Sequence, residues 1–326
     1  MAISTRLTER LGIAHPVISA PMALAAGGRL AAAVSNAGGL GLIGGGYGDG
    51  AWLEAQFREA GNARIGCGFI TWSLKKEPRL LDAVLAHNPA ALFLSFDDPA
   101  LFARQIKDAG ATLMCQVQTR RDAEGALDCG ADVVVAQGAE AGGHAEKRAT
   151  MTLVPEVADL IAKRAPETLL CAAGGIADGR GLAAALMLGA DGVLVGSRFW
   201  ASEEALVHPN LHAVAIAATG DDTVQTSVTD IVRHRDWPER FKIRVLHNEF
   251  TDRWHGREEE LRASIDREAP AFHAAMASGD ARVATPIVGE AAGLISSIEP
   301  AAVILERMVS EAEALLRGAQ RLLGRG

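Results

Sequence analysis

The first two hundred residues of this chain repeat one pattern: a short apolar run followed by an Ala-rich stretch with helical spacing. The runs, rich in Val, Ile, Leu and Phe, predict eight strands over residues 16–19, 41–43, 65–69, 91–95, 112–116, 133–136, 169–172 and 192–195. Apolar residues three and four positions apart predict helices over residues 28–36, 52–60, 80–86, 100–109, 121–129, 155–163 and 181–188.

Strands that are apolar on both faces and alternate with helices are typical of a parallel sheet. Eight strand–helix units in about 200 residues predict a closed (β/α)8 barrel, that is, a TIM barrel in the α/β class. An open, doubly wound sheet is the alternative arrangement of the same units.

Residues 204–283 interrupt this pattern because they are richer in charged residues and include Trp237-Pro238 and the run Glu258–Glu260. We predict a mainly helical cap or substrate insertion beside the mouth of the barrel. Residues 1–203 and 284–326 would then form the barrel with a C-terminal helix. Apolar residues at helical spacing predict that this last helix covers residues 299–323 and packs on the barrel.

Charge and composition exclude several classes of function. The net charge of −8 argues against a surface for nucleic acid or an anionic membrane, which requires a basic face. Every apolar stretch is shorter than the ~20 residues that span a bilayer, and the first residues lack the apolar core of a secretion signal. We therefore expect a cytoplasmic protein that binds neither nucleic acid nor membranes.

The four cysteines are spread along the chain, at positions 67, 115, 129 and 171, and form no Cys-x-x-Cys pair. We expect no disulfides and a reducing compartment. No cluster of Cys and His has the spacing of metal ligands, so no bound metal is expected.

Glycine gathers where the predicted strands end, which is where (β/α)8 barrels place their active sites. Gly174 and Gly175 follow the seventh strand, and Gly196 and Ser197 follow the eighth. In such barrels these two loops frequently bind a phosphate group through backbone N–H groups. The alternative interpretation is that these glycines only let the strands turn into helices.

The sixth strand is followed by Ala136-Gln-Gly-Ala-Glu-Ala-Gly-Gly-His144. Glycines let the backbone approach a ligand closely, and histidine is the side chain whose charge changes most easily near neutral pH. This connection is also the longest between successive predicted strands. The pattern favours a catalytic loop over a tight turn with a solvated histidine.

Several motifs occur together and in order: Pro21-Met22, Asn36-Ala-Gly-Gly-Leu-Gly, Gln116-Val-Gln-Thr119, Gly138-Ala-Glu-Ala-Gly-Gly-His144, Ala173-Gly-Gly-Ile-Ala-Asp-Gly179 and Gly196-Ser-Arg-Phe199. As a set they resemble the nitronate monooxygenases, formerly called 2-nitropropane dioxygenases, which are FMN-dependent TIM-barrel enzymes. The resemblance covers nearly the whole chain. The flavin-dependent enoyl-ACP reductases are also similar, particularly over residues 38–46 and 140–152.

The resemblance implies a catalytic base at His144 and an FMN site. Some relatives carry Lys at the position of Gln116, and relatives often carry Asn at the position of Gly68. The residues implied to bind or border FMN are Pro21, Met22, Ala23, Phe69, Thr71, Gln116, Gly143, Ala173, Gly174, Gly175, Gly196 and Ser197.

The activity implied is the FMN-dependent oxidative denitrification of alkyl nitronates and nitroalkanes with O2. One alternative is an NAD(P)H-dependent FMN reductase of the enoyl-ACP reductase or quinone reductase type. The other is a non-redox barrel that binds a phosphorylated metabolite, such as a lyase. The sequence is compatible with a homo-oligomer and leaves the number of subunits and the physiological substrate open.

Overall fold

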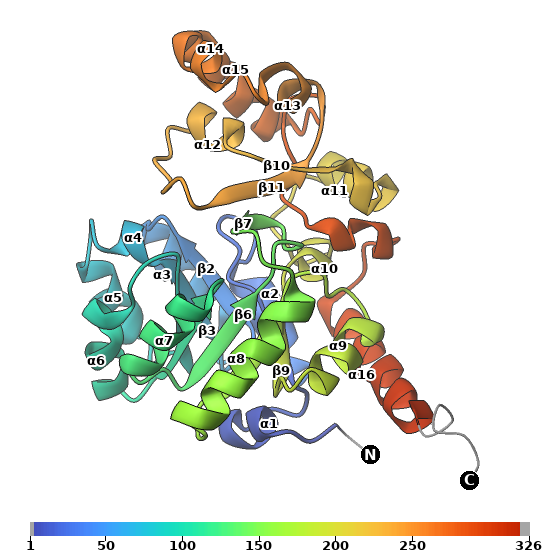
Figure 1. Ribbon diagram of the computed structural model, residues 1–326. Coiled ribbons are helices and arrows are strands. Elements are labelled where there is room, and N and C mark those ends of the chain that lie inside the picture. The colour runs from blue at the N-terminus through green and yellow to red at the C-terminus, as the bar shows by residue number, and fades with distance from the viewer. Residues whose placement is uncertain (1–2, 320–326) are drawn as a thin grey trace.

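A barrel of eight parallel strands forms the centre of the molecule in a computed structural model that describes residues 3–319 (Figure 1). The strand order is β1-β9-β8-β6-β5-β4-β3-β2, and a parallel bridge between Ile18 and Leu40 joins β1 to the segment before β2. The predicted TIM barrel is therefore confirmed. The strands are β1 (Val17–Ser19), β2 (Leu42–Gly46), β3 (Gly66–Ile70), β4 (Ala91–Ser95), β5 (Thr112–Val117), β6 (Val133–Gln137), β8 (Leu169–Ala173) and β9 (Gly192–Val195).

Helices surround this barrel and bury their apolar faces against it. Several begin with a side-chain cap; for example, the Asp178 carboxylate accepts the N–H groups of Arg180 and Gly181. The helices of the barrel are α2 (Gly28–Asn36), α3 (Gly50–Ala60), α4 (Thr71–Leu74), α5 (Arg79–Leu85), α6 (Ala100–Asp108), α7 (Arg120–Asp128), α8 (Thr150–Arg164), α9 (Gly179–Met187) and α10 (Ser197–Trp200).

The barrel is filled at one end and open at the other. Helix α1 (Arg6–Leu11) brings Leu7 and Leu11 against the buried side chains inside the barrel, among them Ile18, Phe93 and Val135. A second apolar layer lies between the strands and the outer helices. A ligand can therefore enter only from the C-terminal ends of the strands.

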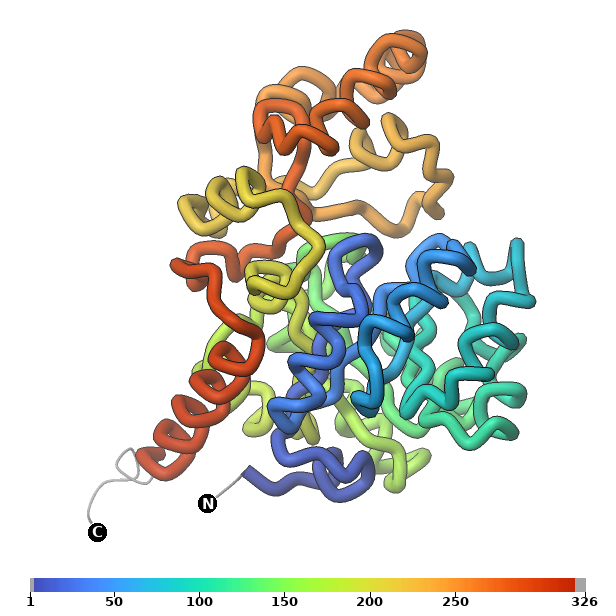
Figure 2. The backbone as a smooth tube through the Cα atoms, turned by 180° about the vertical axis from the view of Figure 1, so that it is seen from behind, coloured from blue at the N-terminus to red at the C-terminus, as the bar shows by residue number. Residues whose placement is uncertain are grey.

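The C-terminal helix α16 (Ala301–Gly318) packs on α9 and α2, in agreement with the prediction for residues 299–323, of which 320–323 lie outside the described residues. Contact with α9 is close: a Cβ at Gly179 would lie 2.3 Å from Glu311 Cβ. Figure 2 shows this helix along the side of the barrel.

The segment 204–283 lies over the C-terminal ends of the barrel strands (Figures 1 and 2). It contains α11 (Pro209–Ala217), η1 (Gly220–Asp222), β10 (Thr223–Thr226), α12 (Val228–Val232), β11 (Lys242–Leu246), α13 (Glu249–Trp254), α14 (Glu258–Ala263) and α15 (Ile265–Ser278). A short helix, η2 (Glu290–Leu294), follows it. We call residues 204–283 the insertion.

Two strands of the insertion were not predicted. β10 and β11 form an antiparallel sheet with β7 (Gly143–Ala145), a short strand within the long connection after β6. Short strands with mixed polar and apolar residues give a weak local signal, and their stability comes from pairing with a distant segment.

Gly41 tests the close packing of the strands against the helices. A Cβ at this position would lie 1.9 Å from the carbonyl oxygen of Ala31 in α2. Because that obstacle is backbone, we expect Gly41→Ala to destabilise the fold by about 1–3 kcal/mol or more. The thermal midpoint, followed by far-UV circular dichroism, should fall.

Gly125→Ala is the matched control, because a Cβ at Gly125 in α7 has nothing within 4 Å. Alanine is the better helix former by about 1 kcal/mol, so this midpoint should stay or rise. Equal midpoints for the two variants would contradict the packing argument.

Candidate active site

A cavity of about 330 Å³ opens at the C-terminal ends of the barrel strands, beneath the insertion. Its position and size are those expected of a small-molecule site in this fold. The predicted site residues that line it are Pro21, Met22, Ala23, Phe69, Gln116, Gly143, His144, Ala173, Gly174, Gly175, Gly196 and Ser197. Thr71 does not line it, because this first residue of α4 is fully buried elsewhere.

Two glycine-containing turns form one wall of the cavity. Gly174 and Gly175 follow β8 with φ angles of 96° and 73°, which favour glycine. Within residues 3–319, the N–H groups of Gly174, Gly175 and Gly196 donate no hydrogen bond. The Ser197 hydroxyl oxygen accepts the N–H of Gly289 at 2.9 Å, which leaves its own proton free. This wall offers a set of unused donors to an anion.

Gln116 contributes a further donor from β5. Its Nε2 is buried and has no hydrogen-bond partner among the described residues, although Gln116 lines the cavity. An unpaired buried amide is costly in free energy, by about 1–3 kcal/mol. Its presence beside a cavity therefore indicates a ligand with an acceptor atom at that place.

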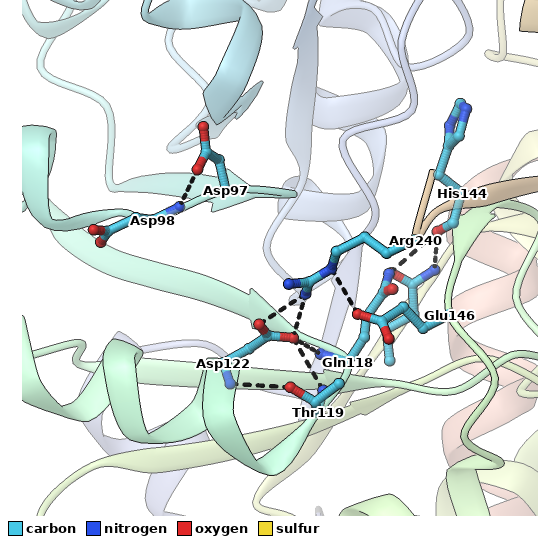
Figure 3. A network of polar contacts seen from close by, with 9 residues as sticks. Asp97, Asp98, Gln118, Thr119, Asp122, His144, Glu146 and Arg240 are labelled. Atoms are coloured by element: carbon cyan, nitrogen blue, oxygen red, sulfur yellow. Dashed lines mark hydrogen bonds and ion pairs between the residues drawn. The ribbon is translucent and has the colours of Figure 1, made fainter. Parts of the chain in front are cut away.

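The backbone of His144 is held by two side-chain amides and by pairing with β11. Its carbonyl oxygen accepts hydrogen bonds from the Nε2 atoms of Gln118 and Gln137, at 3.3 and 3.1 Å. In the antiparallel pairing of β7 with β11, His144 lies opposite Ile243. Figure 3 shows the imidazole pointing away from the amides that bind the carbonyl. These contacts fix the position of the His144 backbone, from which the imidazole projects.

The imidazole itself contacts residues from the insertion. His144 Nε2 lies 2.9 Å from Asp230 Oδ2, and the two side chains are 7% and 5% exposed. The Trp237 ring stacks on the imidazole, with centroids 3.3 Å apart and planes inclined by 10°. Nδ1 has no hydrogen-bond partner among the described residues.

Burial lowers the pKa of His144 below its ordinary value of 6.5, and the Asp230 carboxylate opposes this shift. The imidazole is therefore neutral at pH 7. Because an ionised carboxylate can only accept a hydrogen bond, Nε2 carries the proton, and Nδ1 keeps a lone pair for a substrate.

The loop that carries Trp237 is tied to the barrel by Arg240. The Arg240 guanidinium lies 2.8 Å from Asp122, at the start of α7, and 2.7 Å from Glu146, just after β7 (Figure 3). Asp122 also accepts the backbone N–H of Thr119, so one carboxylate joins the helix cap to the loop. The insertion is thereby fixed above the imidazole.

Asp230, Arg233 and Trp237 are the site residues that the sequence analysis missed. Arg233 lines the cavity and donates from Nη2 to Asp230 Oδ1 at 3.0 Å. Asp230 lies 86 positions after His144 and belongs to no motif, so nothing local indicated their contact. In the sequence, Trp237-Pro238 interrupts the barrel pattern and carries no signal of a binding site.

Neither the cysteines nor a cluster of metal ligands forms a second site in the described part of the chain. All four cysteines are free thiols. Residues 3–319 contain no group of three or more Cys, His, Asp or Glu side chains placed to hold a metal ion. None of the helices described has the length and apolar character needed to cross a membrane.

The barrel and the cavity with its buried imidazole are those of a TIM-barrel enzyme. A family model described as nitronate monooxygenase matches residues 4–66 and 70–311. The chain therefore belongs to the nitronate monooxygenase family and is an oxidoreductase.

Curated relatives agree with this assignment, and a solved structure shares the fold. The chain is 34% identical to a nitronate monooxygenase of Neurospora crassa, over 93% of this chain and 90% of the relative. It is 36% identical to the nitronate monooxygenase npaC of Metarhizium robertsii, over 92% and 91%. The structure of FabK from Thermotoga maritima superposes with a TM-score of 0.86 at 31% identity, covering 98% of this chain and 99% of FabK.

Proposed function

We propose that this protein uses FMN to oxidise alkyl nitronates and nitroalkanes with O2, and that His144 is the catalytic base. The observation that carries the proposal is the neutral imidazole of His144, buried at the cavity with Nδ1 unpaired among the described residues. Two nitronate monooxygenases are 34% and 36% identical to the chain over their aligned lengths.

The residues of the cavity fit FMN. The unpaired Nε2 of Gln116 is a donor for an acceptor atom of the flavin ring. The N–H groups of Gly174, Gly175 and Gly196, with the Ser197 hydroxyl, are donors for the phosphate. Met22 and Phe69 add apolar contact. When bound, FMN supplies the electron-transfer chemistry and the reaction with oxygen.

The role of His144 in this reaction is to accept a proton from the substrate. Its Nδ1 accepts the proton from the carbon next to the nitro group, and the electrons of the broken C–H bond move onto the nitro group, which gives the nitronate. The resulting imidazolium is stabilised by the Asp230 carboxylate. Trp237 limits movement of the ring during this step.

The proposal extends to partners and location. A small nitronate or nitroalkane and O2 are the reactants. A cytoplasmic location and assembly into a homo-oligomer stay predictions from the sequence.

Oxygen uptake tests the reaction class. The FMN-loaded protein should consume O2 when given an alkyl nitronate in the absence of NAD(P)H. The similarity to FabK favours one rival, an NAD(P)H-dependent enoyl reductase. Rapid anaerobic bleaching of the flavin by NAD(P)H, with enoyl turnover and no nitronate oxidation, would establish that rival. A purified protein that shows no flavin spectrum after FMN is added would favour a non-redox barrel.

His144→Ala tests the base. Because a positioned base contributes about 10²–10⁴-fold, kcat/KM for the neutral nitroalkane should fall by that factor. The preformed nitronate needs no deprotonation and should lose much less, with FMN retained. His247→Ala is the control, because His247 is exposed on the insertion between Asp222 and Asp252. An equal loss on both substrates would remove His144 from the role of base.

Gly196→Ala tests the phosphate wall. A Cβ here would meet only Ala20 Cβ at 3.6 Å and Met22 Sδ at 3.9 Å, so the fold tolerates it, although Gly196 lines the cavity. Losing close approach to the phosphate should cost about 1.5–3 kcal/mol. The Kd for FMN, from fluorescence titration, should rise about 10- to 100-fold.

The matched control is Gly50→Ala, at the start of α3, where a Cβ would meet Leu80 Cδ2 at 3.5 Å. Both variants should keep the thermal midpoint of the wild-type apoprotein. If FMN binds equally to both, Gly196 does not border the phosphate.

A further inference from the structure

His144 belongs to the barrel half of the site, whereas the carboxylate that touches it comes from the insertion. Asp230 lies in α12, between the strands β10 and β11 that complete the sheet begun by β7. We propose that Asp230 is a positioning residue, which holds the imidazole of His144 as the Nε2–H tautomer with Nδ1 left for the substrate. This inference rests on the role proposed for His144.

Asp230 determines which nitrogen of the His144 imidazole carries the proton. A neutral imidazole carries its proton on either nitrogen, and the partner of one nitrogen decides which form is present. Asp230 Oδ2 lies 2.9 Å from Nε2. Both side chains are buried, so water does not compete for this contact. A carboxylate at this distance selects the form in which Nε2 is the donor and Nδ1 the acceptor.

The orientation of the carboxylate is fixed as well. Arg233 Nη2 donates to Asp230 Oδ1 at 3.0 Å, which leaves Oδ2 for the imidazole. Arg233 is itself fixed, because its Nε donates to the carbonyl oxygen of Thr229 at 2.8 Å. One helical turn thus holds the carboxylate and its counter-charge in a single arrangement.

The charged side chains around His144 have opposite effects on its pKa. Asp230 raises the pKa of the imidazole, and Arg233 lowers it. Two further titratable groups lie near the pair: burial raises the pKa of Tyr47, which interacts with the charges of Asp230 and Arg233, and the Arg235 guanidinium lies over the Tyr47 ring at 4.0 Å. Burial has the largest effect on this pKa, and Asp230 and Arg233 adjust it in opposite directions.

Asp230→Asn tests the proposal, because an amide of the same shape can either donate or accept. The FMN-loaded protein, labelled with ¹⁵N-histidine, is studied by NMR, and the His144 signals are assigned by their loss in His144→Gln. In the wild type we expect Nε2–H alone and a pKa below 6.5. In Asp230→Asn we expect a population of Nδ1–H and a still lower pKa, because the negative charge is gone.

Arg233→Gln provides the opposite change. It removes the positive charge, so the pKa of His144 should rise while the Nε2–H tautomer remains. Asp280→Asn is the matched control: this insertion residue also pairs with an arginine, Arg282, at 2.7 Å, but on the exposed surface. Asp280→Asn should leave both the tautomer and the pKa of His144 unchanged. A loss of packing alone would not move the two variants in opposite directions.

The pH dependence of kcat/KM for a nitroalkane on the acid side should shift in the same direction as the His144 pKa of each variant. The wild-type rate falls as pH drops through the His144 pKa, below 6.5. This fall should move to lower pH in Asp230→Asn, with a plateau at least about tenfold lower because the wrong tautomer cannot accept the proton. Oxidation of the preformed nitronate should change little.

The outcomes separate the two proposals. An unchanged tautomer and pKa in Asp230→Asn would overturn the positioning role, whatever the activity. If Asp230→Asn does not fold, an unchanged pKa in Arg233→Gln would overturn it. A wild type that shows the expected tautomer but oxidises neither substrate would contradict the proposed function and leave Asp230 as the partner of a histidine with another task.

Discussion

The site depends on the antiparallel pairing of β7 with β11. This contact joins the barrel to the insertion at the residue whose side chain enters the cavity, because His144 lies opposite Ile243 in the register. A register change of one residue would turn His144 to the other face of the sheet. The amides of Gln118 and Gln137, which bind the His144 carbonyl, fix the same residue from the barrel side.

Burial and charge then act on the imidazole in opposite directions. Removing the ring from water favours its neutral form, whereas Asp230 favours the charged form. The first effect keeps a lone pair available near neutral pH, and the second stabilises the cation that forms when a proton arrives. A catalytic base requires both a free lone pair and a stabilised cation. Here the barrel supplies the imidazole, whereas the insertion supplies the Trp237 ring that stacks on it and the Asp230 carboxylate.

Local pattern was enough to predict the barrel and its mouth. The eight strands lie within a few residues of the predicted ranges because each is short, apolar and bounded by glycine or a helix cap. The predicted site residues follow from the positions of the strands, and all of them except Thr71 line the cavity. Thr71 does not line the cavity, because α4 begins at this residue and its side chain is buried. The contact of His144 with Asp230 links positions with no shared motif, so only the three-dimensional structure reveals it.

The wall formed by β3 shows why the polar contacts are concentrated elsewhere. Gly68 lies against Pro21, and a Cβ there would be 2.4 Å from the proline Cγ and 3.3 Å from Phe93 Cβ. A larger side chain at this position, such as asparagine, would need this apolar contact to open. Pro21 and Phe69 make this side of the cavity apolar. Unpaired donors that border the cavity lie on other strands: Gln116 belongs to β5, and the glycine turns follow β8 and β9.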